Sequence, residues 1–389
     1  MRIDLISFSS FLIRSLNANI IDAKQKTIKK GNIAIECNKI VEYDLNKEYI
    51  IDDELNGEGY YVSPGWIDAH THIFYECTES GLPADVSLIP MGVTTTIDGG
   101  SCGYGNWKTF KKNIVDNSIL NVYYSINVSP SGQITERYPE NIDPRCYILE
   151  EYKKIMQEDS KYSRGLKLRY GTEVVEKFGN NVLDEVIELA NKLGCFLTVH
   201  VTNPPCEMEE IINKMRDGDI VCHIYQGKRS TILDENNIVK KAIFKAQKRG
   251  VFFDSADARI NHSYAIIRPA IEQGFKPDII STDLTYASMF RNMCWGLPVV
   301  LSKWLNLGLS LEEVIQACTY NPAKIHHLGD GLGTLDVGAH GNVTIFKVIN
   351  KEFHMKNRLN EDFIGQKLIV PQVTIINGKI VYRNVEFPF

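Results

Sequence analysis

Short β-rich segments alternate with amphipathic segments through most of this 389-residue chain, and this alternation limits the possible folds more than any other feature. Two amphipathic segments, 181–194 and 237–250, place apolar residues at helical spacing and close on a glycine, as helices do. The β-rich segments lie at residues 65–71, 93–99, 120–128, 165–171, 195–201, 220–226, 251–256 and 278–283. Eight strands that alternate with helices predict an α/β fold, a (β/α)8 TIM-like barrel over residues 63–335.

An open, doubly wound sheet is the alternative arrangement of alternating strands and helices. Such a sheet usually carries a glycine-rich phosphate loop directly after its first strand. Here the first β-rich segment ends in His-Thr-His at residues 70–72. The sequence therefore favours the closed barrel.

The two ends of the chain differ from its middle, because they are β-rich without intervening helices. Residues 13–22 and 31–43 precede the barrel, and residues 341–349 and 372–384 follow it. Within the last segment, Asn377-Gly378 between two β-rich runs is a strong hairpin signal. We expect both ends, residues 1–62 and 336–389, to form one small β-sandwich domain beside the barrel.

Composition and charge exclude several classes of partner. The net charge of -5 gives no basic surface for nucleic acid or an anionic membrane. We expect neither a signal peptide nor a membrane span near the start, where Arg14 interrupts a short apolar run. The nine cysteines form no Cys-x-x-Cys pair, which favours reduced thiols in the cytoplasm. We expect a cytoplasmic homo-oligomer that acts on a small molecule.

Histidines and an aspartate stand at the ends of several predicted strands. His70 and His72 are two residues apart on one strand, so their side chains share a face and can hold one metal ion. Alone, they could simply be polar residues at a strand end. His200, His223 and Asp283, however, end three further strands, and four of the nine histidines lie at such ends. Because active sites of these barrels lie at the C-terminal strand ends, the pattern predicts a metal site.

Lys167 lies in the apolar segment 165–171. Burial disfavours the charged ammonium and so favours the neutral amine. A neutral amine can react with carbon dioxide to give a carbamate, whose two oxygens can bind two metals. The alternative is a lysine that extends to solvent or pairs with an acid. The nearby histidines favour the carbamate.

At this point the chain resembles a known group of enzymes. "PGWIDAHTHI", together with Lys167, His200, His223 and Asp283, resembles the amidohydrolase superfamily in its binuclear branch with a carboxylated lysine. Residues 319–346 resemble the C-terminal segment of that superfamily in which the chain passes from the barrel back into the β-domain. The motifs "CHIYQGK", "VFFD" and "IISTDL" resemble the dihydroorotase-like deacetylases, which hydrolyse N-acyl amino acids or O-acyl hydroxy acids.

The resemblance implies a ligand set of six residues. His70, His72 and Asp283 would bind one metal, His200 and His223 the other, and the Lys167 carbamate would bridge them. Imidazole and carboxylate ligands suit zinc, with manganese, iron and nickel as alternatives. A hydroxide that bridges the two metals would attack the substrate carbonyl. Asp283 would carry its proton to the leaving group.

Two departures from that family pattern are present. The family usually has His-Gly where this chain has Asp257-Ala258, within residues 253–262. Because this loop follows the seventh strand at the mouth of the site, we expect the added charge to change substrate choice. The usual G-x-x-ADL motif reads "GAHGNV" at residues 338–343. We expect this second change to be neutral.

Three further residues are candidates for substrate contact. Arg169 shares a strand face with Lys167, and Arg259 lies in the unusual loop. Either arginine could clamp a substrate carboxylate, or could be a solvated surface charge. Cys102 could line the pocket, with a packing thiol as the alternative.

Three functions are compatible with these features. The first is hydrolysis of an amide or ester bond in a small acylated amino or hydroxy acid. The second is opening or closing of a cyclic amide, as in dihydroorotase or hydantoinase. The third is a non-catalytic barrel scaffold, whose signature would be a missing ligand, whereas all six positions are filled here.

Overall fold

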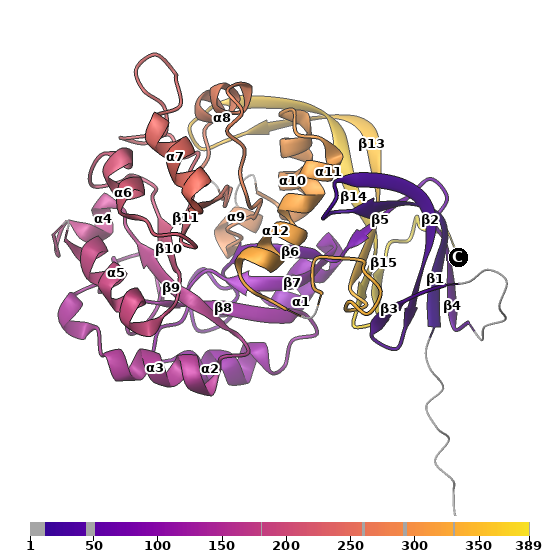
Figure 1. Cartoon of the computed structure of the whole chain (residues 1–389), viewed down its shortest axis with the longest axis horizontal. Helices are drawn as coiled ribbons and strands as arrows, with labels where there is room; N and C mark the ends of the chain where they lie inside the picture. Colours follow the sequence, from indigo (N-terminus) through magenta and orange to yellow (C-terminus); the bar gives the residue numbers. More distant parts are fainter. Residues whose placement is uncertain are drawn as a thin grey trace, which may run out of the picture.

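The computed structural model describes residues 12–43, 51–179, 181–258, 261–290, 294–329 and 331–388, and it contains two sheets (Figure 1). The middle of the chain, from residue 66 to residue 254, contains a parallel sheet of seven strands, in which strands adjacent in sequence are adjacent in space. These strands are β6 (Trp66–Thr71), β7 (Val93–Asp98), β8 (Asn121–Asn127), β9 (Ser163–Arg169), β10 (Leu197–His200), β11 (Ile220–Cys222) and β12 (Phe252–Asp254). Seven of the predicted strands are therefore confirmed.

The predicted eighth strand, residues 278–283, is not a regular strand. The segment instead makes single parallel bridges to both edge strands, between Asp254 and Ile279 and between Thr71 and Leu284. Regular pairing fails because the Thr282 N–H donates to the Asp68 carboxylate at 3.0 Å, and because Asp283 has a φ of 49°. The sheet curls so that one segment contacts both of its edges, but a continuous eight-stranded ladder is not confirmed.

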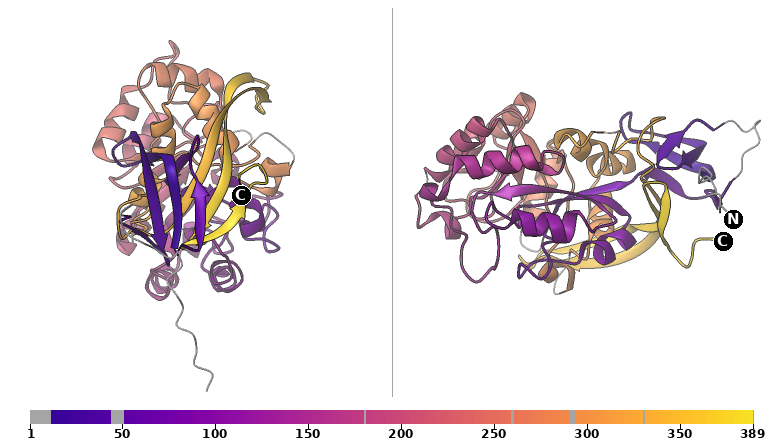
Figure 2. Two further views of the ribbon diagram at one scale, coloured as in Figure 1. Left: turned by 90° about the vertical axis from the view of Figure 1, so that its right-hand side faces the viewer. Right: turned by 90° about the horizontal axis from the view of Figure 1, so that it is seen from below.

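Helices follow most of the parallel strands and lie outside the sheet (Figures 1 and 2). The predicted helices at 181–194 and 237–250 are confirmed as α5 and α7, and each ends at a glycine with positive φ. The helices are α1 (Ala84–Leu88), α2 (Trp107–Phe110), α3 (Leu149–Glu158), α4 (Thr172–Val175), α5 (Val182–Leu193), α6 (Met208–Lys214), α7 (Lys241–Arg249), α8 (Tyr264–Glu272), α9 (Tyr286–Phe290), α10 (Leu297–Asn306), α11 (Leu311–Ala317) and α12 (Tyr320–Ile325). Two short 3₁₀ helices are η1 (Ile89–Met91) and η3 (Pro144–Cys146), and a short π-helix is η2 (Lys111–Val115).

Burial of the parallel strands explains their apolar sequence. All residues of β6 and β7 are buried, as in a sheet covered on both faces. The apolar face of α5, with Val182, Val186 and Leu189, packs into the same core. None of the helices in the described ranges is long and apolar enough to cross a membrane.

The two chain ends meet in a second sheet, which lies at one end of the molecule (Figure 2). We call it the small sheet, after the small domain that was predicted from the chain ends. Strand β5 pairs antiparallel with β13, with Pro64 opposite Val343, and so joins the two ends. The strands are β1 (Leu12–Asp22), β2 (Thr27–Glu36), β3 (Lys39–Val41), β4 (Asp53–Asn56), β5 (Tyr61–Pro64), β13 (Val343–Lys356), β14 (Asp362–Ile376) and β15 (Lys379–Arg383). They form one eight-stranded sheet, so the predicted β-sandwich is not confirmed. The domain boundaries at residues 62 and 336 stay a prediction.

The predicted hairpin at Asn377-Gly378 is confirmed between β14 and β15. Ile376 pairs with Lys379, and the two turn residues have φ values of 49° and 72°. Positive φ at both positions is what a type I′ hairpin turn requires, which explains the Asn-Gly pair.

A longer hairpin, β13–β14, extends from the small sheet along the helices that surround the parallel sheet (Figure 1). It is anchored to α10, because the Ile369 N–H donates to Ser302 Oγ at 2.9 Å and Asn306 Nδ2 donates to the Lys367 carbonyl at 2.8 Å. The hairpin therefore carries its tip, residues 357–361, away from the small sheet toward α8.

Candidate active site

A cavity of about 400 Å³ opens where the parallel strands end. We call this hollow the central cavity. Its lining residues are His70, His72, Gln133, Glu136, Arg137, Tyr138, Pro139, Lys167, Arg169, Glu173, Val174, His200, Thr202, His223, Ala258, Asn261, Asp283, Thr285 and Arg358. All six predicted metal ligands line it. Their position agrees with the rule that barrel sites form at the C-terminal strand ends.

His70, His72 and Asp283 converge at the base of the central cavity. His72 Nε2 lies 3.1 Å from Asp283 Oδ1, and His70 Nε2 lies 3.6 Å from the same oxygen. The three side chains are buried. Their ligand atoms lie within 4.8 Å of one another, which is close enough for one metal ion to bind all three.

The second nitrogen of each of three histidines is held by another group. His72 Nδ1 lies 2.9 Å from Ser101 Oγ, and His223 Nδ1 lies 2.8 Å from the Ala256 carbonyl. His70 Nδ1 lies 3.5 Å from Asp254 Oδ2. Such contacts orient a histidine and leave its other nitrogen as the ligand atom. His223 Nε2 is buried and has no hydrogen-bond partner among the described residues, as expected of a nitrogen that receives a metal.

The pKa values of these histidines also favour metal binding. Burial lowers the pKa of His70 and His200 well below the usual value, and lowers that of His223 to about 3. A neutral imidazole is the form that binds a metal. Burial alone would raise the pKa of Asp283, but its contacts with His70 and His72 outweigh burial and lower this pKa. The carboxylate is therefore ionised.

Two glycines after β7 give His70 and Lys167 their space. A Cβ at Gly99 would lie 2.4 Å from His70 Cδ2, and a Cβ at Gly100 would lie 2.7 Å from Lys167 Cβ. Gly100 also has a φ of 91°, which favours glycine. The Asp98 carboxylate fixes this loop, because it accepts from the Ser101 N–H at 2.6 Å and from the Ile73 N–H at 3.0 Å.

Lys167 extends from β9 into the middle of the group. Its Nζ lies 3.0 Å from His70 Nε2 and 3.3 Å from Cys222 Sγ. The side chain is buried, so its amine does not extend into bulk solvent. Among the described residues, no carboxylate forms an ion pair with it. Lys167 therefore neither extends to solvent nor pairs with an acid that the structure describes, which were the two alternatives to a carbamate.

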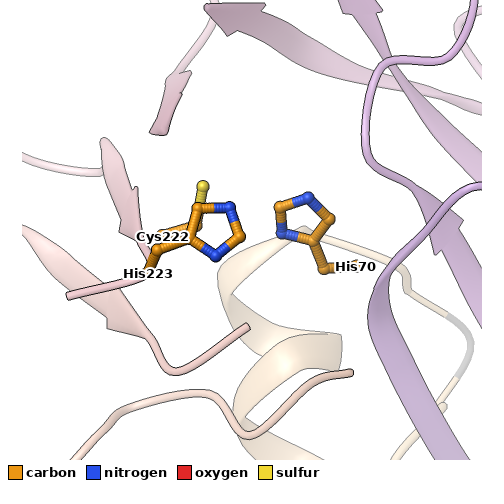
Figure 3. Close-up of side chains that lie close together, drawn as sticks. All are labelled: His70, Cys222 and His223. Carbon is orange, nitrogen blue, oxygen red and sulfur yellow. The ribbon is translucent and has the colours of Figure 1, made fainter. Parts of the chain in front are cut away.

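A second group of ligand atoms combines His70 and His223 with Cys222 (Figure 3). Cys222 is not among the predicted ligands, because neighbouring residues on a regular strand point to opposite faces. His223 has a φ of 66°, which interrupts the extended backbone, so that both side chains reach the group. His200 belongs to neither group, but its ring centre lies 4.3 Å from that of His223.

Asp283 has a further partner that the sequence did not suggest. Asn261 Nδ2 donates to Asp283 Oδ2 at 3.0 Å, and Thr202 Oγ1 donates to Asn261 Oδ1 at 2.7 Å. This chain of hydrogen bonds orients the carboxylate, with its other oxygen toward the histidines. Asn261 comes from a loop, where sequence spacing does not reveal which side chains meet.

The three residues predicted to contact the substrate do not all lie at the central cavity. Arg169 lines the central cavity, and its guanidinium donates to Glu140 Oε2 at 3.2 Å. Cys102 is fully buried in the apolar core and is absent from the cavity wall, as the packing alternative expects. Arg259 lies outside the described residues.

Asp257 does not place a negative charge at the cavity mouth, and that expectation is wrong. Its carboxylate pairs with the Lys303 ammonium of α10, and both side chains are buried. Ala256 and Ala258 have φ values of 37° and 27°, so the alternation of an extended chain does not apply and Asp257 turns inward. Of the unusual pair, only Ala258 lines the central cavity.

Asp257→Ala should destabilise the protein strongly, since it leaves the buried Lys303 ammonium without a counter-charge. We expect a loss of about 3–5 kcal/mol in the free energy of unfolding, measured by urea denaturation. The double variant Asp257→Leu with Lys303→Met should recover most of this loss. Glu150→Gln, which breaks an exposed pair with Lys153, should cost about 1 kcal/mol or less. Equal losses in Asp257→Ala and Glu150→Gln would contradict the buried ion pair.

The sequence is similar to several named enzymes. A deacetylase of Agrobacterium fabrum is 27% identical over 335 residues, which are 86% of this chain and 82% of that protein. A deacetylase of Enterococcus faecalis is 29% identical over 332 residues, 84% of this chain and 88% of that protein. A dihydroorotase of Aquifex aeolicus is 24% identical and covers 95% of this chain and 98% of its own length.

Solved structures are similar over nearly the whole chain. The crystal structure of an adenine deaminase has a TM-score of 0.87 at 26% identity and covers 96% of this chain and 100% of its own. The crystal structure of a dihydroorotase has a TM-score of 0.86 at 25% identity, with 96% and 98% covered. The sequence pattern of the Amidohydrolase family matches residues 61–381, which span both the parallel strands and the strands that follow them. The chain therefore belongs to the amidohydrolase family and is a hydrolytic enzyme.

Proposed function

We propose that this enzyme is a metal-dependent hydrolase that cleaves an amide or ester bond of a small acylated amino or hydroxy acid. The observation that carries the proposal is the convergence of His70, His72, His223 and Asp283 in one cavity, with Lys167 between them. The relatives named deacetylases, which match this chain over most of their length, support the reaction class.

The donor set fits two divalent metals, with zinc expected from the imidazole and carboxylate ligands. His70, His72 and Asp283 would hold one ion, and His200 and His223 the other. Lys167, carboxylated on its amine, would bridge them. When bound, the ions would polarise the substrate carbonyl and lower the pKa of water so that it becomes a nucleophile at neutral pH.

Asp283 is suited to move the proton of the reaction. Its Oδ1 faces His70 and His72, while Asn261 holds Oδ2 at 3.0 Å. A carboxylate held in this way can take a proton from the attacking water and give it to the leaving nitrogen or oxygen. Arg169 lies on the same wall, where its guanidinium is already paired with Glu140 at 3.2 Å.

A cyclic amide is the second candidate substrate, because a dihydroorotase is similar over 95% of this chain and a dihydroorotase structure has a TM-score of 0.86. The two candidates share the same chemistry. They differ in whether the leaving group departs or stays attached to the acyl group.

A substrate panel separates the candidates. The purified enzyme, with zinc supplied, would be assayed with N-acetyl amino acids, O-acetyl hydroxy acids, dihydroorotate, hydantoin and adenine. We expect the highest kcat/KM for an acylated acid. Preferential turnover of dihydroorotate or hydantoin would establish the cyclic amide instead, and turnover of adenine alone would overturn both candidates.

A further inference from the structure

The tip of the β13–β14 hairpin brings one cation to the central cavity. Residues 357–361 join the strands beyond the pair formed by Lys356 and Asp362. Arg358 belongs to this tip and lines the central cavity, although the hairpin starts in the small sheet at the other end of the molecule. The small sheet thus contributes a side chain to a site that the parallel strands otherwise form.

The tip is fixed to the start of α8 by several contacts. Glu361 accepts from Ser263 Oγ at 2.7 Å and from the Tyr264 N–H at 2.8 Å. Asn357 Nδ2 donates to the His262 carbonyl at 3.2 Å. The rings of Tyr264 and Phe363 are stacked, with centres 5.0 Å apart. These contacts therefore hold the hairpin tip, and with it Arg358, at the cavity.

The backbone of the tip is also ordered internally. Asn357 Oδ1 accepts from the N–H groups of Leu359 and Glu361, at 2.9 and 3.0 Å. A side chain that caps its own turn in this way fixes the intervening backbone. The direction in which Arg358 leaves the turn is thereby set, while its side chain stays exposed.

The guanidinium of Arg358 differs from the other arginines of the cavity wall. Arg169 is paired with Glu140 at 3.2 Å, and Arg137 with Glu79 at 3.4 Å. Within the part of the chain that the structure describes, the Arg358 guanidinium has neither a hydrogen bond nor an ion pair. A cation on a cavity wall with free donors is available to an anion from solution.

From this arrangement we propose that Arg358 binds the carboxylate of the acylated acid and selects for it. This inference rests on the proposed function, and it adds a specificity residue that comes from the small sheet. A guanidinium can donate two parallel hydrogen bonds to a carboxylate, which an ammonium cannot do. The neutral carboxamide of the same substrate lacks the charge that Arg358 recognises.

The test compares two substrates that differ only in this group, an N-acetyl amino acid and its carboxamide. The quantity measured is a ratio, namely kcat/KM for the acid divided by kcat/KM for the carboxamide. Arg358→Met should lower this ratio about 10- to 100-fold, the loss expected for a charge-assisted hydrogen bond. Arg358→Lys, which keeps the charge but not the paired donors, should give an intermediate ratio. Metal content should match that of the wild type in both variants.

Lys356→Met is the matched control, because it removes a half-exposed cation from the same hairpin outside the cavity. It should leave the ratio unchanged. If the wild type hydrolyses acylated acids but Arg358→Met keeps the wild-type ratio, the role of Arg358 is wrong and the proposed function stands. If the wild type hydrolyses no acylated acid, both proposals fail.

Discussion

Lys167→Ala is expected to lose most of its bound metal and to lower kcat by at least about a hundredfold. The reason is geometric, because the Lys167 amine lies 3.0 Å from His70 Nε2, where its carbamate would be a ligand that the protein itself supplies to both ions. Metal analysis of the purified variant and turnover of the best substrate would measure both losses.

Two controls make this result specific to the carbamate. Lys153→Ala, which changes a half-exposed lysine on α3, should keep wild-type metal content and turnover. Adding short carboxylic acids with bicarbonate to Lys167→Ala should restore part of the activity, since a free carboxylate can occupy the place of the carbamate. Full metal content and full activity in Lys167→Ala would rule out the carbamate.

Asp283→Asn should keep the fold and much of the metal but lower kcat by about 10²–10⁴-fold, the usual contribution of general acid–base catalysis. Asparagine preserves an oxygen near His70 and His72, yet it cannot carry a proton. Circular dichroism and metal analysis would check the first expectation, and steady-state kinetics the second. Asp143→Asn, at the loop aspartate directly before η3, is a control that should change neither. Near wild-type turnover in Asp283→Asn would mean that another group moves the proton.

The histidines of this site could be predicted because strand periodicity fixes them. His70 and His72 are two residues apart on and just after β6, and His200 and His223 end or follow neighbouring strands. A parallel sheet brings such strand ends to one edge, so spacing in sequence becomes proximity in space. The same logic identified seven of the strands.

The remaining parts of the site depend on backbone geometry that no periodic pattern records. Cys222 joins the group only because His223 has positive φ, and Asp257 turns away from the cavity because Ala256 and Ala258 do. The segment 278–284 bridges two strands without becoming one, since the Asp68 carboxylate takes the Thr282 N–H. Such local departures from regular strand geometry arise from tertiary contacts, so the residue types alone do not predict them.

Contacts between distant segments were also missed. Asn261 reaches Asp283 from a loop, and Arg358 reaches the cavity from a hairpin of the small sheet. The β-rich ends predicted a separate unit, but nothing in their sequence indicated that β13–β14 extends along the helices around the parallel sheet.

The number of zinc ions bound per chain when turnover stops rising tests the central claim most directly. Metal-depleted enzyme would be titrated with zinc, and bound metal and hydrolysis of an N-acetyl amino acid would be followed together. We predict that turnover is negligible without metal and reaches its maximum at about two ions per chain. Full turnover in the metal-depleted enzyme, or a maximum that bears no relation to bound zinc, would contradict a hydrolase built on His70, His72, Lys167, His200, His223 and Asp283.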